Sequence, residues 1–257
     1  MTDQMQNIDP ASHPQNYGTC QENKNPQNES LEIEEEDIRI NKSLRLNFIK
    51  KVYGILCAQL AITAIMCILS MTISSFATFQ REHYWIQIVL AIFSIAILLV
   101  LFCSRDLSKR VPVNYALLFT FTLFESYSVS ACCAMYDRQT VLLAALFTLG
   151  ITIGLTVYAF NTKTDFTVLT GILFVCLIGL VLFGIACIFI RSRVVNIIYC
   201  ALGAIVFGIY IVCDTQILIG GKSREIGMDE YVFGAVSLYL DIINLFLYIL
   251  SLLGDRN

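Results

Sequence analysis

Residues 167–190 read TVLTGILFVCLIGLVLFGIACIFI, an apolar run that contains no charged residue. A helix needs about 20 apolar residues to cross the hydrocarbon layer of a membrane, so this run alone is long enough. Similar runs precede and follow it, at residues 52–74, 86–104, 113–135, 141–160, 195–219 and 232–253. The sequence therefore predicts an all-α fold, a polytopic membrane protein with a bundle of seven transmembrane helices.

The composition of the whole chain agrees with this class. Of 257 residues, 57% are hydrophobic and only 14% are charged, and the mean hydropathy is +0.71. The connections between the runs are too short to hold a folded soluble domain, and no Gly-rich phosphate loop is present. We therefore expect the lipid bilayer, and no nucleic acid or nucleotide, as the partner of this chain, and we expect its function to lie in the bundle.

Residues 1–44 have a different character. Nine of the 20 acidic residues and three of the four prolines lie before residue 38. Such a segment has too little apolar surface to offset the entropy lost on ordering. We predict a disordered, acidic, cytosolic tail at 1–44 and a transmembrane domain at 45–257. No removable signal peptide is recognisable at the start, so the first span should direct insertion.

Lys and Arg are distributed unevenly between alternate connections, which predicts orientation. Counted from Arg39 onward, eleven lie on the side of the amino terminus and five on the other side. The amino-terminal side is therefore predicted to be cytosolic, and seven spans place the carboxyl terminus outside or in a lumen. In an alternative, residues 232–253 dip into the membrane and return, which would leave the carboxyl terminus cytosolic.

Nine of the ten cysteines lie in or beside the apolar runs. Cysteines in such surroundings act as small apolar residues, so we do not predict a disulfide framework.

Three ionisable residues lie inside the predicted spans, and all are acids: Glu125, Asp214 and Asp241. The spans contain no Lys or Arg to balance them. A charged Asp at the bilayer centre costs about 3 kcal/mol, so such residues are usually buried, paired, protonated or bound to a cation. These acids are our candidate functional residues, although each could have a structural role.

Asp214 and Asp241 lie on consecutive antiparallel spans at similar depth, so we expect their carboxyls to meet. Two carboxylates in contact cannot both ionise cheaply, and the pair should share a proton at about pH 6 to 8. The sequence therefore predicts a proton sensor at these two residues.

Polar residues recur at helical spacing around these acids. The stripe that supports Asp241 consists of Ser237, Asn244, Tyr248 and Ser251. Glu125 has a similar stripe and can face the same interior. Acids and oxygen-bearing neighbours without an internal cation fit a path for protons or for calcium, a hard cation that takes oxygen ligands. Calcium is expected as a permeant ion, not a cofactor.

Longer motifs around the two aspartates resemble the Bax inhibitor motif-containing transmembrane family, and its Lifeguard branch in particular. These motifs are CDTQILIGG from Cys213 and DEYVFGAVSLYLDIINLFLYILSLLG from Asp229. Further agreement lies in FIKKVYGILCAQL from Phe48, FTFTLFES from Phe119, LTVYAFNTKTDFT from Leu155 and IFIRSRVVNIIYCALGA from Ile188.

The resemblance implies a seven-helix bundle of the endoplasmic reticulum or Golgi that is linked to calcium leak and to suppression of apoptosis. It implies that Asp214 and Asp241 form a pH-responsive pair that opens or closes a calcium path. Some versions of the family picture add a basic partner from another helix, and Arg105 is the nearest candidate here.

Two other functions stay open at the level of sequence. A non-conducting regulator could act through contacts with cell-death or calcium-release membrane proteins. An intramembrane aspartyl protease could use the two aspartates as general acid and base, but the motifs typical of those proteases are not present around Asp214 and Asp241. We therefore do not expect an enzyme.

Overall fold

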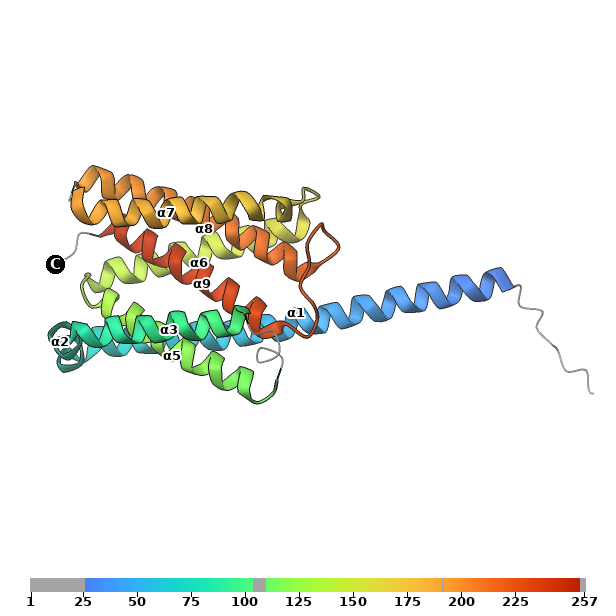
Figure 1. The fold of residues 1–257 in the computed structure, drawn as a ribbon, viewed down its shortest axis with the longest axis horizontal. Coiled ribbons are helices and arrows are strands. Elements are labelled where there is room, and N and C mark those ends of the chain that lie inside the picture. The colour runs from blue at the N-terminus through green and yellow to red at the C-terminus, as the bar shows by residue number, and fades with distance from the viewer. Residues whose placement is uncertain (1–25, 104–109, 191, 255–257) are drawn as a thin grey trace, which may run out of the picture. The chain divides into compact units, whose positions relative to one another are not determined.

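The computed structural model describes residues 26–103, 110–190 and 192–254, with side chains from residue 35 onward (Figure 1). It divides the chain into two units, residues 1–41 and residues 42–257. The second unit is a helical bundle, and the described residues contain no strand. The predicted all-α class is therefore confirmed.

Helices follow one another with short connections. In chain order they are α1 (Pro26–Thr72), α2 (Ser74–Glu82), α3 (Tyr84–Cys103), α5 (Val113–Cys133), α6 (Arg138–Asn161), the 3-10 helix η1 (Phe166–Leu169), α7 (Thr170–Ile190), α8 (Arg193–Ile219) and α9 (Tyr231–Leu253). In the described part of the chain, seven helical segments are long and apolar enough to cross a membrane, and each coincides with one of the predicted spans. The protein is therefore a multi-pass membrane protein.

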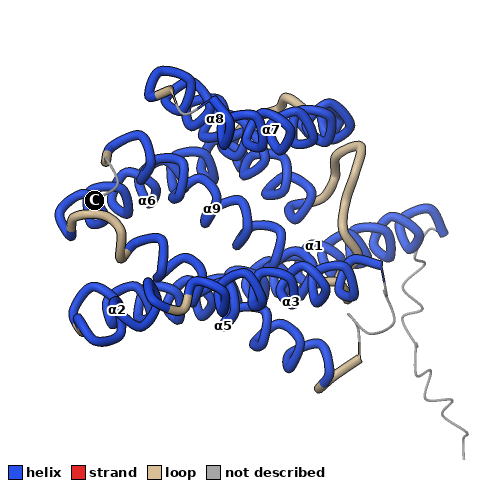
Figure 2. The backbone as a smooth tube through the Cα atoms, turned by 60° about the vertical axis from the view of Figure 1, so that its left-hand side comes forward, coloured by secondary structure: helices blue, strands red, loops and turns tan. Residues whose placement is uncertain are grey.

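The bundle is layered around α9. Figures 1 and 2 show α9 between a layer that contains α7 and α8 and a layer that contains α3 and α5, with α6 beside it. Helices that face lipid expose large apolar side chains on most of their surface, whereas α9 is the most buried of the spans. This position explains how the last span can carry polar residues such as Asp241, because these residues face protein and not lipid.

α9 is one continuous helix of 23 residues. At 1.5 Å per residue it extends about 34 Å, enough to cross a hydrocarbon layer of about 30 Å. A hairpin that dips in and returns needs a break in the helix, and α9 has none. The structure therefore supports a complete seventh span and not the alternative that the polar residues of 232–253 suggested.

Two segments differ from the sequence prediction. α1 begins at Pro26, so the part of the predicted tail that the structure describes is helical, and this part is rich in Glu, which favours helices. The predicted connection near Arg81 contains the short helix α2, which buries Gln80. Residues 1–25 lie outside the described part, and the boundary between tail and bundle stays a prediction.

Candidate functional site

α8 and α9 bring two carboxyl groups together inside the bundle. Asp214 lies near the end of α8 and Asp241 near the middle of α9, and their side chains are in contact at hydrogen-bonding range. Asp241 is only 5% exposed. Antiparallel packing of two helices joined by a short connection accounts for this contact, because it places the end of one helix beside the first half of the next.

The contact between these carboxyls has a chemical requirement. An ionised carboxylate only accepts hydrogen bonds, so two carboxyls bond to each other only when one carries a proton. Among the described residues, no donor reaches Oδ2 of Asp241. A buried oxygen without a donor is satisfied by a shared proton or by a bound cation. The contact between Asp214 and Asp241 is therefore compatible with a shared proton or with a bound cation.

Two further groups of α8 lie near the pair, and neither carries a positive charge. Tyr210 and Cys213, both on α8, lie close enough for the charges of both aspartates to act on them. The Sγ of Cys213 donates to the carbonyl of Phe166 at 3.1 Å. Tyr210 and Cys213 are neighbours of the pair that sequence reasoning did not identify as part of the site, since neither residue type is unusual in an apolar helix.

The residues of the predicted polar stripe of α9 make different contacts. Asn244 donates to the carbonyl of Leu240 at 2.8 Å, so it is bonded within its own helix. The hydroxyl of Tyr248 lies 3.0 Å from that of Tyr199 on α8. The ring of Tyr248 fits only because Gly203 has no side chain, since an added Cβ would lie 2.6 Å from that ring.

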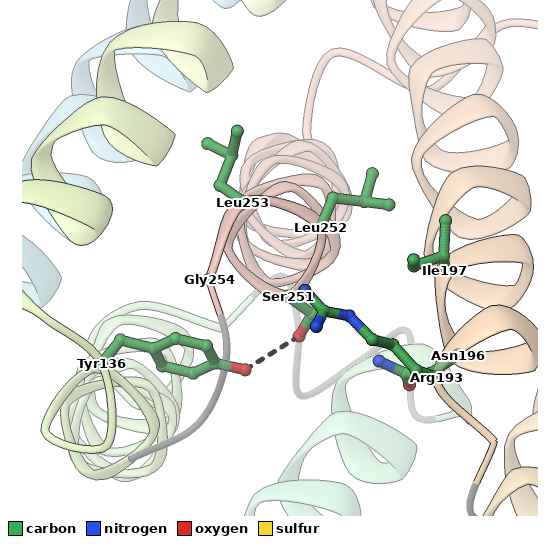
Figure 3. Close-up of a pocket in the computed structure, with 8 residues that line it drawn as sticks. All are labelled: Tyr136, Arg193, Asn196, Ile197, Ser251, Leu252, Leu253 and Gly254. Carbon is green, nitrogen blue, oxygen red and sulfur yellow. Dashed lines mark hydrogen bonds between the residues drawn. The ribbon is translucent and has the colours of Figure 1, made fainter.

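Ser237 and Ser251 complete the stripe. Ser237 is half-buried on the same helix, and the hydroxyl of Ser251 lies 3.2 Å from that of Tyr136. Figure 3 shows this last bond at the wall of a pocket of about 380 Å³ at the carboxyl-terminal end of the bundle, where Arg193 and Asn196 approach from α8. The stripe therefore extends from the aspartates to an open polar pocket.

Glu125 lies in a different part of the bundle. Its carboxylate accepts a hydrogen bond from the hydroxyl of Ser94 on α3, and it lies near Tyr239 of α9. Tyr239 and Asp241 are two residues apart, which places them on opposite faces of α9. The structure therefore brings Asp214 and Asp241 together and places Glu125 across the helix from them.

Around Tyr239, hydroxyl and amide groups form a buried network that joins α1, α5 and α9. The hydroxyl of Thr63 lies 2.8 Å from that of Tyr239 and 2.9 Å from that of Ser126. Gln59 donates to the hydroxyl of Thr122 at 3.0 Å. These groups are neutral, and together they connect three helices through hydrogen bonds rather than charges.

Arg45 is a residue that sequence reasoning counted only as a positive charge. Its guanidinium donates four hydrogen bonds to backbone carbonyls of another part of the chain, those of Ile217 at 2.8 Å, Leu218 at 2.7 Å, Ile219 at 3.2 Å and Ile226 at 2.7 Å. The last carbonyls of a helix have no partner within the helix and carry negative partial charge. Arg45 therefore caps the end of α8, one turn beyond Asp214.

A second set of hydrogen bonds fixes the connections at this end. Asp165 accepts bonds from the hydroxyls of Ser223 and Thr167, both at 2.6 Å. These donors, Ser223 first, hold the pKa of Asp165 below its usual range. Gln216 of α8 donates to the carbonyl of Thr164 at 2.9 Å and accepts from the amide of Phe166 at 2.8 Å. The connection before α7 is thus bound to α8 beside the aspartates.

Two further predictions concern groups that could act with the pair. Arg105, the candidate basic partner, lies outside the described residues. Within the described residues, no group of three or more His, Cys, Asp or Glu could hold a metal ion. Calcium takes about six to eight oxygen ligands, so the two carboxyls alone offer part of a calcium site.

The comparisons with known proteins agree with these features. The family described as inhibitor of apoptosis-promoting Bax1 matches residues 45–257. Protein lifeguard 3 of Homo sapiens is 32% identical over 84% of this chain and 71% of its own length. Protein lifeguard 4 of Mus musculus is 37% identical over 83% of this chain and 87% of its own length, and the Golgi anti-apoptotic protein of Vaccinia virus (strain Lister) is 36% identical over the same shares. The chain therefore belongs to the Bax inhibitor family, in its Lifeguard branch.

Proposed function

We propose that this protein is a pH-sensitive calcium leak channel of intracellular membranes that contributes to calcium homeostasis and to suppression of apoptosis. The observation that carries the proposal is the contact between Asp214 and Asp241 inside the bundle. Buried carboxyls that face each other between membrane helices are costly unless a proton or a cation compensates their charge. In a calcium leak that responds to pH, protons and calcium ions would both take this compensating role.

The proposed mechanism is an exchange at the two carboxyls. In acid, a proton shared between Asp214 and Asp241 holds α8 against α9. When that proton leaves, two negative charges repel each other at short range, and the helices separate or recruit a cation. Calcium is suited to this position because carboxylate oxygen is its preferred ligand. The polar stripe and the pocket at Ser251 would extend the path toward the carboxyl-terminal end.

The names of similar proteins support the proposed location and the proposed role in apoptosis. One relative is named a Golgi anti-apoptotic protein, and the matching family is described as inhibitor of apoptosis-promoting Bax1. We propose a Golgi or endoplasmic reticulum location with the amino terminus in the cytosol, as the distribution of Lys and Arg indicates. Cell-death or calcium-release membrane proteins are the partners that we expect.

Reconstitution tests the proposed function directly. The purified full chain in liposomes that contain a calcium dye should pass calcium without ATP, and the rate should change as the pH is varied around neutrality. Protein-free liposomes and liposomes with an unrelated seven-helix protein are the controls. A dye signal that stays at the level of these controls at every pH would reject the channel and favour the non-conducting regulator.

A further inference from the structure

An open groove of about 460 Å³ lies where α1 passes α5 near the amino-terminal end of the bundle. Gly54, Ala58 and Ile62 line it from α1, and Leu118 and Phe119 line it from α5. The lining is mainly apolar, and all of it comes from α1 and α5, not from α8. It is therefore a feature that the proposed calcium path does not use.

Small residues create this groove. A Cβ added at Gly54 would have no other heavy atom within 4 Å, and Ala58 lies one turn further along the same exposed face. Larger side chains at these two positions would fill the space between the helices. The groove is consequently a hollow in the surface that faces the membrane interior.

A positive charge is held at the outer end of the groove. The Nζ of Lys51 lies 3.3 Å from the centroid of the Tyr231 ring and 6.0 Å from that of the Tyr115 ring. Cation–π contacts of this kind position an ammonium group but do not neutralise it, because a phenol is uncharged near pH 7. Lys51 is therefore a fixed cation at the mouth of an apolar groove.

The length of the groove matches one leaflet of a bilayer. Lys51 and Ile62, which line its two ends, are eleven residues apart on α1, or about 16 Å at 1.5 Å per residue. Half of a hydrocarbon layer of about 30 Å is about 15 Å. We propose that the groove binds an anionic phospholipid, with one acyl chain against Gly54 and Ala58 and the phosphate at Lys51.

Photolabelling tests this site in the full chain. The purified protein is placed in phosphatidylcholine vesicles that contain phosphatidylserine with a photoactivatable acyl chain, and the labelled peptides are identified by mass spectrometry. Labelling should concentrate on residues 54–62 and 115–122. Labelling spread evenly over all lipid-facing helices would overturn the proposal, and this part of the test needs no variant.

Matched variants test the binding of the acyl chain and the binding of the headgroup separately. Gly54→Leu fills the groove and should remove most of the labelling at 54–62, whereas Gly179→Leu, at an equally open position on α7, should not. Lys51→Gln should lower the preference for phosphatidylserine over phosphatidylcholine about fivefold, and Lys50→Gln at the adjacent exposed position should change it less. Equal labelling by both lipids in the unchanged protein, or displacement of the label by cholesterol alone, would overturn the anionic phospholipid as the ligand.

Discussion

Both faces of α9 bury polar groups, but the groups that they bury differ in chemistry. On one face, the hydroxyls of Tyr239, Thr63 and Ser126 bond to one another, and the nearest acid, Glu125, is bonded to Ser94. On the other face, Asp241 meets Asp214, and no donor among the described residues reaches its Oδ2. In the first arrangement the atom without a partner in the described part of the chain, Oε1 of Gln59, belongs to a neutral amide, whereas the second arrangement places two carboxyls together and requires a proton or a cation.

This difference indicates which face holds the bundle together and which face responds to its surroundings. Neutral hydrogen bonds between membrane helices contribute about 0.6 kcal/mol on average, and their strength does not depend on pH near neutrality. The interaction between two carboxyls changes from attractive to repulsive when their shared proton leaves. The comparison therefore predicts that the Tyr239 face of α9 contributes to the stability of the bundle, whereas the Asp241 face determines its response to pH.

The largest expected effect is on the acidic face. Asp214→Asn and Asp241→Asn each preserve side-chain volume and hydrogen bonding but remove the shared proton, so each should make calcium flux independent of pH near neutrality. Flux is measured in dye-loaded liposomes at a series of pH values. Glu125→Gln is the matched control, because Glu125 lies across α9 and bonds to Ser94. If both Asn variants keep the flux and the pH profile of the unchanged protein, the sensor is not at this pair.

Substitution of Arg45 should have the next largest effect, and this effect is on the stability of the fold. Arg45→Gln removes most of the four hydrogen bonds to the carbonyls at the end of α8 and leaves those carbonyls unsatisfied. Hydrogen bonds to a charged group contribute about 1.5–3 kcal/mol, so we expect a loss of about 2 kcal/mol in the free energy of unfolding. Thermal unfolding in detergent measures it, with the exposed Lys42→Gln as control; equal unfolding temperatures for the two variants would contradict the capping role.

Much of this fold could be predicted from the sequence, because a span needs only length and hydrophobicity. The depth of Asp214 and Asp241 along their helices also follows from counting residues. What could not be predicted was rotation about the helix axis. Glu125 has the same polar spacing as Asp241, yet it faces Tyr239. Arg45 could not be predicted as a helix cap either, because its partners are backbone carbonyls about 170 residues away, which have no sequence signature.

On the neutral face, Thr63→Val should have a moderate effect. It removes the hydroxyl that Tyr239 and Ser126 share and keeps a side chain of similar shape. Leaving buried polar groups without a partner costs about 1–3 kcal/mol, and the value in a membrane bundle should lie at the low end of that range. The pH profile of flux should not change. A shifted profile would mean that the two faces of α9 are coupled and would weaken the comparison above.

The smallest effect near neutral pH is expected at Asp165, which is acidic but lies outside the spans. Its donors, the hydroxyl of Ser223 first and then Thr167, hold its pKa below the usual range. A lowered pKa in the folded state means that the carboxylate contributes stability above the ordinary Asp range and loses it only as the pH falls through its own, lower pKa. Asp165 is therefore ionised throughout the neutral range, and Asp165→Asn should leave the shape of the flux profile unchanged.

The weakened bonds to Ser223 should instead appear as faster hydrogen exchange at residues 221–226. A flux profile that moves in Asp165→Asn but not in the Asn variants of Asp214 and Asp241 would place the sensor in the connection and not inside the bundle.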